Sequence, residues 1–334
     1  MSRPARIRFT LEKKIGFASL YNMRICLVGS ILRQTVITDH GEYSGWGGMT
    51  ESAIAPFAAL LDKNSTIYFV GNVGKEDLDE LRRFFKDNYP IVNTDGIGIN
   101  PGGTDHHRGT KHASRVKLKM DPTKYEQIKP FLKDVDVVIF NFGNIDDIDP
   151  AAIEAVRKNS DALIYVDVHR KPFGVDKDGY TYSRGWPNWE KYLQYADVVQ
   201  MNRHECEALF QTKCDNMGSF IEKAELILAS GRPSQVLITL GREGVLLVHK
   251  PASSNHEYLK APAIPTNVVD VSGCGDAFAA GYLVALHEGR SLKKALAVGS
   301  LMGSINCEFM GYMRGLDRES IEKRIPPDFS CEQI

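Results

Sequence analysis

Apolar and polar positions alternate between two periods from residue 23 onward. Short apolar runs, typical of buried strands, are followed by segments that carry apolar residues at helical spacing. The runs lie at 24–30, 66–73, 135–142, 162–168, 198–202 and 236–240. Because repeated β-α units bury both faces of a sheet, the pattern predicts an α/β fold with a mostly parallel central sheet and helices on both faces.

The remaining elements follow from the same pattern. We expect helices at 50–61, 76–87, 125–133, from residue 150, at 273–289 and at 292–309. Further strands are expected at 91–99 and 115–119, with a hairpin of 244–249 and 257–261. Residues 1–22 form an N-terminal extension, with one added strand around Ile7, Phe9 and Leu11 as an option. In open sheets of this type ligands bind outside the carboxyl ends of the strands, so the loops there are the candidates for a site.

The amino-acid composition limits the classes of partner that we expect for this chain. The chain has 334 residues, 43% hydrophobic and 25% charged, which is enough for a large core in one domain or two smaller ones. A net charge of −1 argues against nucleic acid or a membrane surface as the main partner. No apolar run is long enough to span a membrane, and residues 1–22 lack a signal-peptide core. The six cysteines form no C-x-x-C pair, which favours a cytoplasmic protein with reduced thiols.

The stretch 268–289 carries the strongest chemical signal. An apolar run ends at Asp270, and Gly273 and Gly275 precede a long apolar helix. The first N–H groups of a helix lack partners and attract anions, and glycines let a phosphate approach the backbone. Asp276, in the first turn, either complements the helix N-terminus or accepts the proton of a substrate hydroxyl, as an aspartate does in kinases. Residue types alone leave both roles open.

Residues 270–278, DVSGCGDAF, resemble the D-T-x-G-A-G-D-x-F signature of the ribokinase-like (PfkB-type) carbohydrate kinases. Serine replaces threonine and cysteine replaces alanine. The resemblance implies that Gly273, Cys274 and Gly275 form the anion hole for the transferred phosphate. It implies that Asp276 deprotonates the acceptor hydroxyl. The expected fold is therefore ribokinase-like, with a small or reduced β lid.

Two further residues of this signature concern ions and nucleotide. In many family members the positions that match Asp270 and Ser272 lie near a monovalent cation, so K⁺ enters as an optional ion at Asp270. The resemblance also places Ser272 beside the bound cofactor.

Two other motifs concern ATP. Asn202 and Glu205 follow an apolar strand, and Asn202 can be a plain helix N-cap. The resemblance instead gives an N-x-x-E motif, whose glutamate holds the water shell of the Mg²⁺ on the ATP phosphates, and Mg²⁺ needs few protein carboxylates. Thr239, Gly241 and Gly244 resemble the T-x-G-x-x-G turn beside the nucleotide. They also suit a hairpin connection, and both roles are compatible.

The acceptor side departs from the family. Gly47 and Gly48 resemble the start of a G-G-x-x-x-N segment that holds acceptor hydroxyls, but Ser52 stands where asparagine is expected. Gln34 falls near a position that is often aspartate. Asn141, at the carboxyl end of its strand, is expected to contact the acceptor as well. These departures leave the phosphoryl machinery intact and put a ribose-like acceptor in doubt.

Residues 167–172, DVHRKP, resemble a D-x-N-x-R-P stretch of fructokinase and ketodeoxygluconate kinase relatives. His169 replaces asparagine and Lys171 replaces arginine. Lys171 can place a cation near the transferring phosphate, although lysine lacks the bidentate geometry of arginine. The alternative is a solvated strand end.

Residues 102–115 contain three histidines and several cations, among them Arg108. Adjacent histidines rarely share one metal ion, and no carboxylate or cysteine has zinc-like spacing. In the resembled family this region belongs to the lid over the acceptor, with lid-type segments at about 38–46 and 91–120. The cations suggest an acceptor with an acid or phosphate group. A homodimer formed through the lid is an option that the resemblance leaves open.

Together these observations predict a kinase domain over 23–330 that moves the γ-phosphate of ATP, with Mg²⁺, to a hydroxyl of a small molecule. A sugar or sugar acid is the favoured acceptor. Two alternatives stay open: a nucleoside or other non-sugar kinase on the same fold, and a non-catalytic nucleotide-binding regulatory homologue. No G-x-x-x-x-G-K-[ST] occurs, so a P-loop is not expected.

Overall fold

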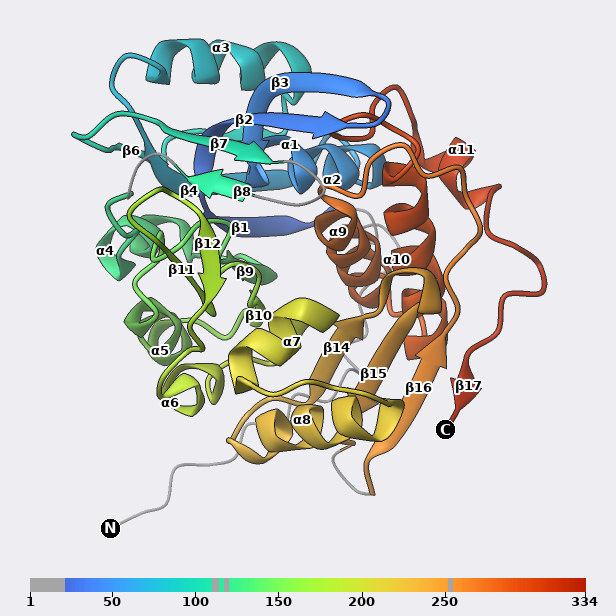
Figure 1. Cartoon of the computed structure of the whole chain (residues 1–334). Helices are drawn as coiled ribbons and strands as arrows, with labels where there is room; N and C mark the ends of the chain where they lie inside the picture. Colours follow the sequence, from blue (N-terminus) through green and yellow to red (C-terminus); the bar gives the residue numbers. More distant parts are fainter. Residues whose placement is uncertain (1–21, 110–113, 117–119, 252–254) are drawn as a thin grey trace.

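The computed structural model describes residues 22–109, 114–116, 120–251 and 255–334. A large sheet runs through the molecule, and helices cover both of its faces (Figure 1). Its strands are β1 (Arg24–Gly29), β4 (Thr66–Val73), β5 (Val92–Asn93), β6 (Ile97–Ile99), β9 (Val137–Asn141), β10 (Leu163–Asp167), β13 (Val198–Asn202), β14 (Gln235–Thr239), β15 (Val245–His249), β16 (Glu257–Ala261) and β17 (Glu332–Gln333).

The order across this sheet is β17-β16-β15-β14-β13-β10-β9-β1-β4-β5, and β6 also pairs with β4. Pairing is parallel from β14 through β13, β10, β9, β1 and β4 to β5 and β6. It is antiparallel from β14 through β15 and β16 to β17. The mostly parallel sheet expected from the sequence is confirmed.

Each parallel strand is apolar on both sides because helices cover both faces. Ile25 and Leu27 of β1 join one core cluster, whereas Cys26 and Val28 join the other. The first cluster packs under α2 (Ile54–Leu60), α3 (Leu78–Asn88), α9 (Cys274–His287), α10 (Leu292–Asn306) and α11 (Arg318–Glu322). The second packs under α4 (Tyr125–Ile128), η1 (Lys129–Phe131), α5 (Ala151–Asn159), α6 (Trp189–Leu193), α7 (Arg203–Phe210) and α8 (Met217–Ala229).

A separate small sheet lies beside the carboxyl ends of the central strands (Figure 1). Its order is β3-β2-β7-β8, from β3 (Gly41–Gly48), β2 (Ile31–Thr38), β7 (Asp105–Gly109) and β8 (Ser114–Val116). We call this sheet the lid. The hairpin of β11 (Phe173–Val175) and β12 (Thr181–Ser183) faces it, since Arg115 and Tyr180 form an isolated antiparallel bridge.

Several local predictions differ from the structure. The strand expected at 91–99 is two short strands separated by residues 94–96, and the helix expected at 50–61 is split at Ala53 into α1 (Met49–Ser52) and α2. β2, β3 and β7 were not predicted because glycines and polar residues interrupt their apolar pattern. α8 was missed although Phe220, Ala224 and Leu228 mark one buried helical face.

Two predicted segments fall partly or wholly outside the described residues. Of the strand expected at 115–119, the structure describes 115–116 within β8, and the added strand expected within 1–22 lies outside the described residues. In the described part of the chain no helix has the length and apolar character to cross a membrane.

Candidate active site

The glycine turn before α9 lies at the carboxyl ends of the central strands. Gly273 has φ +70° and stands at the N-cap of α9, and a Cβ there would come within 2.7 Å of Ser52 Cβ. Both the left-handed backbone and the close approach of α1 therefore require glycine. At Gly275 a Cβ would meet only Gln200 Nε2, at 3.6 Å. A Cβ at Gly275 would make an ordinary van der Waals contact with Gln200, so steric space alone does not require glycine at this position.

Asp276 turns toward the sheet and does not cap its own helix. Asn141 Nδ2, at the end of β9, donates to Asp276 Oδ1 at 2.7 Å, and α9 has no side-chain cap at Gly273. The carboxyl group is 8% exposed and borders a small cavity that is lined mainly by apolar side chains such as Phe57 and Ile139. Burial raises the pKa of Asp276 above its ordinary value, although the His169 charge and the hydrogen bonds of Ser52 and Asn141 oppose the rise.

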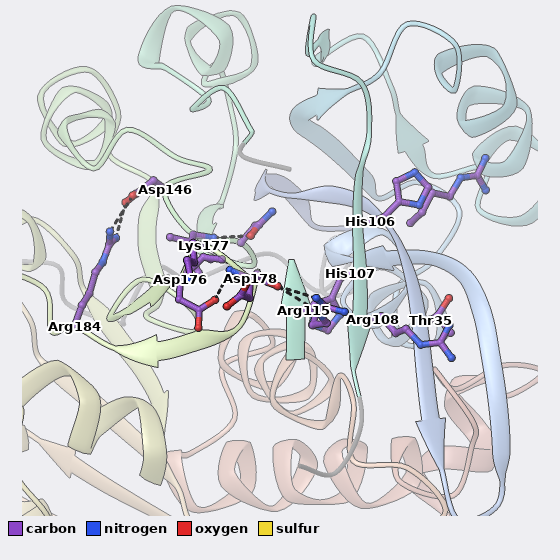
Figure 2. A pocket seen from close by; sticks show the side chains of 15 residues that line it. Thr35, His106, His107, Arg108, Arg115, Asp146, Asp176, Lys177, Asp178 and Arg184 are labelled. Atoms are coloured by element: carbon purple, nitrogen blue, oxygen red, sulfur yellow. Dashed lines mark hydrogen bonds and ion pairs between the residues drawn. The ribbon is translucent and has the colours of Figure 1, made fainter. Parts of the chain in front are cut away.

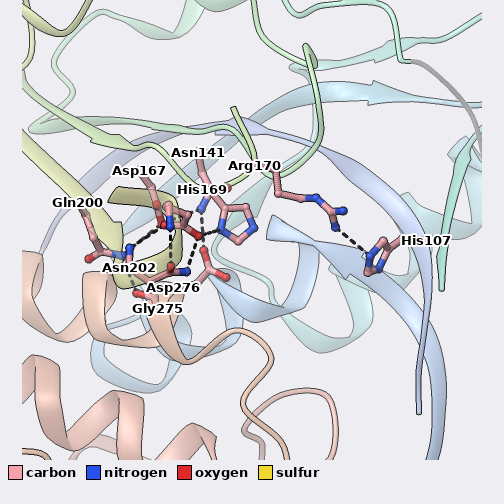
Figure 3. Close-up of polar contacts among 10 residues, drawn as sticks. His107, Asn141, Asp167, His169, Arg170, Gln200, Asn202, Gly275 and Asp276 are labelled. Atoms are coloured by element: carbon pink, nitrogen blue, oxygen red, sulfur yellow. Dashed lines mark hydrogen bonds and ion pairs between the residues drawn. The ribbon is translucent and has the colours of Figure 1, made fainter. Parts of the chain in front are cut away.

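Buried side-chain amides hold the residues around Asp276 in place through a network of hydrogen bonds (Figure 3). Gln200 Nε2, in β13, donates to Asp167 Oδ2 at 3.2 Å and to the Gly275 carbonyl oxygen at 3.1 Å. The Tyr165 hydroxyl donates to Gln200 Oε1, and Asn141 Nδ2 also lies 3.3 Å from Asp167 Oδ2. Sequence analysis missed Gln200 and Tyr165. The available signal was a glutamine, 2% exposed, in the otherwise apolar strand VVQMN.

Asp167, His169 and Glu205 form a compact cluster next to Asp276. Their ligand atoms lie within 4.8 Å of one another, and His169 Nδ1 is 3.5 Å from Glu205 Oε1. Burial alone would lower the pKa of His169, but Glu205, Asp167 and Asp276 outweigh it and raise the pKa to about 9. Burial raises the pKa of Asp167 well above its ordinary value, with the Glu205 and Asp276 charges adding to the rise. At neutral pH His169 is therefore a cation beside Glu205.

Asn202 and Glu205 cap α7 reciprocally. Asn202 Oδ1 accepts from the Glu205 amide at 3.0 Å, and Glu205 Oε2 accepts from the Asn202 amide at 2.7 Å. The capping role weighed from the sequence is therefore present. It does not compete with a role toward Mg²⁺, because a glutamate can hold this ion through its water shell.

The donor set suits a hydrated Mg²⁺ better than a directly ligated one. Asp167 and Glu205 offer carboxylate oxygens, which Mg²⁺ prefers, but the third group is the His169 nitrogen. Both carboxylate oxygens of Glu205 already accept hydrogen bonds from Asn202. Contact between Glu205 and Mg²⁺ through a water molecule would keep these hydrogen bonds. The first turn of α9, with glycines at 273 and 275, offers backbone that a phosphate group can approach closely near this cluster.

Asp270 holds the loop before α9. Its Oδ1 accepts from the Ser272 amide at 2.9 Å and its Oδ2 from the Gly311 amide at 3.0 Å. The Ser272 carbonyl in turn accepts from Asn306 Nδ2 at 2.7 Å. The carboxylate thus has a structural role, and the K⁺ expected beside Asp270 stays a prediction.

The turn after β14 has a structural role too. Thr239 ends β14, and the short 3₁₀ helix η2 (Gly241–Glu243) follows. Gly244 has φ +91°, and a Cβ there would lie 2.0 Å from the Ala261 carbonyl oxygen, so glycine is required to close the hairpin. At Gly241, φ +61°, a Cβ would meet nothing within 4 Å, which leaves space beside the turn for the nucleotide expected there.

On the acceptor side, the β3–α1 turn lies against the phosphate turn. Gly48 has φ +66°, and a Cβ there would come within 2.6 Å of the Ser30 carbonyl oxygen. Ser52 Oγ donates to the Gly48 carbonyl oxygen at 2.5 Å, while its Cβ faces Gly273. Gly47 accepts from the Thr50 hydroxyl at 2.6 Å. The structure therefore brings Gly48 and Ser52 to the anion hole.

Gln34 lies on the lid in register with His107. Paired residues of neighbouring strands point to the same face. His107 Nε2 is 2.8 Å from Arg170 Nη1, so this face of the lid meets the loop that carries His169 (Figure 3).

Lys171 and Arg108 are not brought to Asp276. Lys171 Nζ donates to Asp146 Oδ1 at 2.7 Å and lies 5.6–5.8 Å from the ring centroids of Phe142 and Trp186. Arg108 has a side chain 60% exposed on the lid. Arg170, which sequence analysis left without a role, follows His169 in the chain and contacts His107 of the lid.

A cavity of about 780 Å³ opens between the lid and the β11–β12 hairpin (Figure 2). Strands β2, β7 and β8 supply one wall. The loop after β9, the hairpin turn and Arg184 supply the other. The lining residues of the lid include Arg33, Thr35 and Arg108, which lie on the face opposite the one that Gln34 and His107 share.

Comparison with known proteins identifies the family. The pfkB family carbohydrate kinases match residues 151–318, which is half of the chain and includes Asp276 and the Asn202–Glu205 pair. The chain belongs to the pfkB family. A curated relative, the bifunctional protein HldE of Bradyrhizobium diazoefficiens, is 30% identical over 124 residues, which are 37% of this chain and 24% of that protein. The chain covers 36% of the adenosine kinase of Saccharomyces cerevisiae, over 124 residues, and 37% of the 1-phosphofructokinase of Haloferax volcanii, over 118 residues.

Solved structures confirm the ribokinase-like fold of this pfkB protein. A pyrophosphate-dependent kinase of the ribokinase family, complexed with a pyrophosphate analogue and myo-inositol, has a TM-score of 0.71 at 19% identity, covering 90% of this chain and 99% of that one. Ribokinase of Arabidopsis thaliana, complexed with ribose and ATP, has a TM-score of 0.71 at 18% identity, covering 92% and 100%.

Proposed function

We propose that this pfkB-family protein is a phosphotransferase that moves the γ-phosphate of ATP to a hydroxyl of a small molecule, with a sugar or sugar acid as the favoured acceptor. One observation carries the proposal: the buried carboxylate of Asp276 stands in the first turn of α9, directly after the glycine turn 273–275, and is held by Asn141. The base and the anion site are thus adjacent, as transfer of a phosphoryl group to a hydroxyl requires.

The chemistry follows from the positions of these groups. With Oδ1 held by Asn141, the Asp276 carboxylate accepts the proton of the acceptor hydroxyl. The hydroxyl oxygen bonds to the γ-phosphorus, the bond to the β-phosphate oxygen breaks, and ADP leaves with that electron pair. The amides of Gly273 and Gly275 receive the charge that develops on the phosphoryl oxygens, whereas the Cys274 amide already donates to the Val271 carbonyl oxygen at 3.4 Å. Burial raises the pKa of Asp276 toward the working pH, which favours proton transfer.

Neighbouring groups orient the reactants. Asn141 Oδ1 is buried and has no hydrogen-bond partner among the described residues, so it is suited to accept from a second acceptor hydroxyl. The cationic His169 places positive charge near the phosphates. Mg²⁺, held through water by Glu205, would neutralise phosphate charge when it is bound with ATP.

The donor is open to direct test, because one structural neighbour was solved with ATP and another is described as pyrophosphate-dependent. The experiment measures acceptor-dependent formation of ADP, or of phosphate from pyrophosphate, with Mg²⁺ and a panel of sugars, sugar acids, sugar phosphates and nucleosides. We expect turnover with ATP and at least one sugar-type acceptor. Nucleoside-only turnover would favour the non-sugar kinase. ATP binding without turnover on the whole panel would favour the regulatory homologue.

A further inference from the structure

Two thiols meet at the glycine turn before α9. Cys274 lies in the middle of the turn, between Gly273 and Gly275, and its side chain is hydrogen-bonded to that of Cys307. The pfkB signature has alanine where this chain has Cys274, so a turn of this kind forms without a thiol at that position. The cysteine therefore adds a reactive group to the anion site without being needed for its shape.

The end of α10 faces the glycine turn. Gly303 and Cys307 are four residues apart at this end and so lie on one face. A Cβ at Gly303 would lie 3.2 Å from the Cys274 carbonyl oxygen, and Asn306 Nδ2 donates to Cys274 Sγ at 3.6 Å. These contacts place Cys274 against the face of α10 that ends at Cys307.

Backbone hydrogen bonds hold the two cysteines together. The Cys307 carbonyl oxygen accepts from the amides of Val269 at 2.8 Å and Asp270 at 3.2 Å. The Asp270 carbonyl oxygen in turn lies 3.9 Å from Cys274 Sγ. The loop 269–274 is thus attached to residue 307 and turns its cysteine back toward it. Proximity of the two side chains is the first geometric requirement of a disulfide.

The other cysteines are less suited to oxidation. Cys274 and Cys307 are both partly exposed, so a small oxidant in the cleft reaches them. Cys331 is partly exposed too, but it contacts the Lys293 carbonyl oxygen and no other cysteine in the part of the chain that the structure describes. The remaining three cysteines are buried, although two of them form a second hydrogen-bonded pair: Cys26, Cys206 and Cys214.

The two thiols differ in reactivity. The hydrogen bond with Cys274 lowers the pKa of Cys307, against the opposing effects of burial and of the charges of Asp270 and Glu308. The same hydrogen bond, together with burial, raises the pKa of Cys274 well above its ordinary value. Because the thiolate is the form that reacts with peroxide, Cys307 is the sulfur expected to react first. The disulfide that results is the same whichever sulfur begins.

We propose that Cys274 and Cys307 form an oxidative modification site, at which hydrogen peroxide produces a disulfide that disables the anion site and a thiol reductant restores it. The Cys307 thiolate attacks one peroxide oxygen, an S–O bond forms as the O–O bond breaks, and the hydroxide that leaves is protonated to water. The Cys274 sulfur then attacks the Cys307 sulfur, the S–O bond breaks, and the oxygen leaves as water with the Cys274 proton. Peroxide thereby accepts the two electrons that the thiols lose.

The disulfide would act on the phosphate turn directly. Closing the bond moves Cys274 Sγ toward Cys307 and away from Asn306 Nδ2, and the neighbours Gly273 and Gly275 move with residue 274. A displacement of about 1 Å at reacting groups can lower turnover about 100-fold. We therefore expect a loss of about 10- to 100-fold in kcat. This effect on turnover rests on the proposed function, whereas formation of the disulfide does not.

The first test is chemical and needs no acceptor. The full chain is treated with hydrogen peroxide, alkylated and digested without reductant. We expect two free thiols to be lost, a peptide that links residues 274 and 307, and full recovery of both thiols with dithiothreitol. Cys307→Ser and Cys274→Ala should each abolish the link. Oxidation that stops at a sulfenic acid on one cysteine, or a link between Cys206 and Cys214 alone, would overturn the proposal.

The second test measures turnover, or ATP binding by calorimetry if no acceptor is turned over. Peroxide should lower kcat or weaken ATP binding in the parent, and dithiothreitol should reverse the change. Cys307→Ser should match the untreated parent and resist peroxide. Cys331→Ser, the matched control, removes another partly exposed thiol and should stay as sensitive as the parent. A 274–307 disulfide that leaves both readouts unchanged would overturn the inactivation and leave the kinase proposal intact.

Discussion

Asn141 Nδ2 and Asp276 Oδ1 are joined by a 2.7 Å hydrogen bond across 135 residues of chain. This contact connects the end of β9 to the first turn of α9. It fixes the orientation of the carboxyl group, which Ser52 also contacts through a hydrogen bond.

Asp276→Asn should lower kcat by about 10²–10⁴-fold, because an amide cannot accept the hydroxyl proton. Asparagine has the same shape, so the melting temperature should stay close to that of the parent, and ATP binding should persist. Steady-state kinetics and a thermal melt on one preparation check both expectations. Retention of most of the turnover would remove Asp276 from the role of base.

Asn141→Ala should shift the pH dependence of kcat/KM. The Asn141 hydrogen bond lowers the pKa of Asp276, so its loss raises that pKa further and moves the acidic limb of the profile to higher pH. At a pH above the limb the loss of activity should be smaller than at a pH below it. A parallel loss at every pH would show that Asn141 positions substrate only.

Gly275→Ala and Gly244→Ala form a pair that separates function from folding. A Cβ at Gly275 meets only Gln200 Nε2, so alanine should be tolerated in the helix, with a gain of up to about 1 kcal/mol, while it fills the phosphate space and lowers kcat/KM. At Gly244 the Cβ would meet a carbonyl oxygen at 2.0 Å with φ at +91°, so alanine should cost at least about 1–3 kcal/mol. Denaturant melts and kinetics on both variants test this. Full activity in a stable Gly275→Ala protein would contradict the anion hole.

His169 should contribute stability that depends on pH. Its pKa is raised to about 9 in the folded chain, against about 6.5 for an unperturbed histidine. A raised pKa stabilises the fold fully below about pH 6.5, and the contribution is lost as pH rises through about 9. The side chain is 36% exposed, so solvent screening reduces the effect.

The corresponding measurement compares melting temperatures of the parent and His169→Gln between pH 6 and pH 9.5. The gap should narrow steadily over that interval. A gap that is constant across it would mean that His169 acts through packing and not through its charge.

The central sheet, the helices α9 and α10 and the phosphate turn could be predicted from sequence because their apolar periodicity and their glycines are local signals. The family resemblance correctly implied a small β lid, but the bounds of β2, β3 and β7 could not be predicted, since β3 reads GEYSGWGG and its pairing with β2 is not a local signal. The contacts around Asp276 could not be predicted either, because they join residues that are far apart in the sequence. Gln200 reaches Gly275 across 75 residues and Arg170 reaches His107 across 63, and only the folded chain brings them together.

A single residue, Ser30, separates β1 of the central sheet from β2 of the lid. The returning strand β3 ends beside it, because the Met49 amide donates to the Ser30 carbonyl oxygen at 3.2 Å. The β2–β3 hairpin thus leaves the central sheet and returns to it at the same residue, Ser30. Helix α1, which contains Ser52, begins directly after the hairpin. Ser52 lies directly against Gly273. A tilt of the hairpin over a bound acceptor would therefore move Ser52 and Gly273 together, which links closure over the acceptor to the shape of the turn before α9.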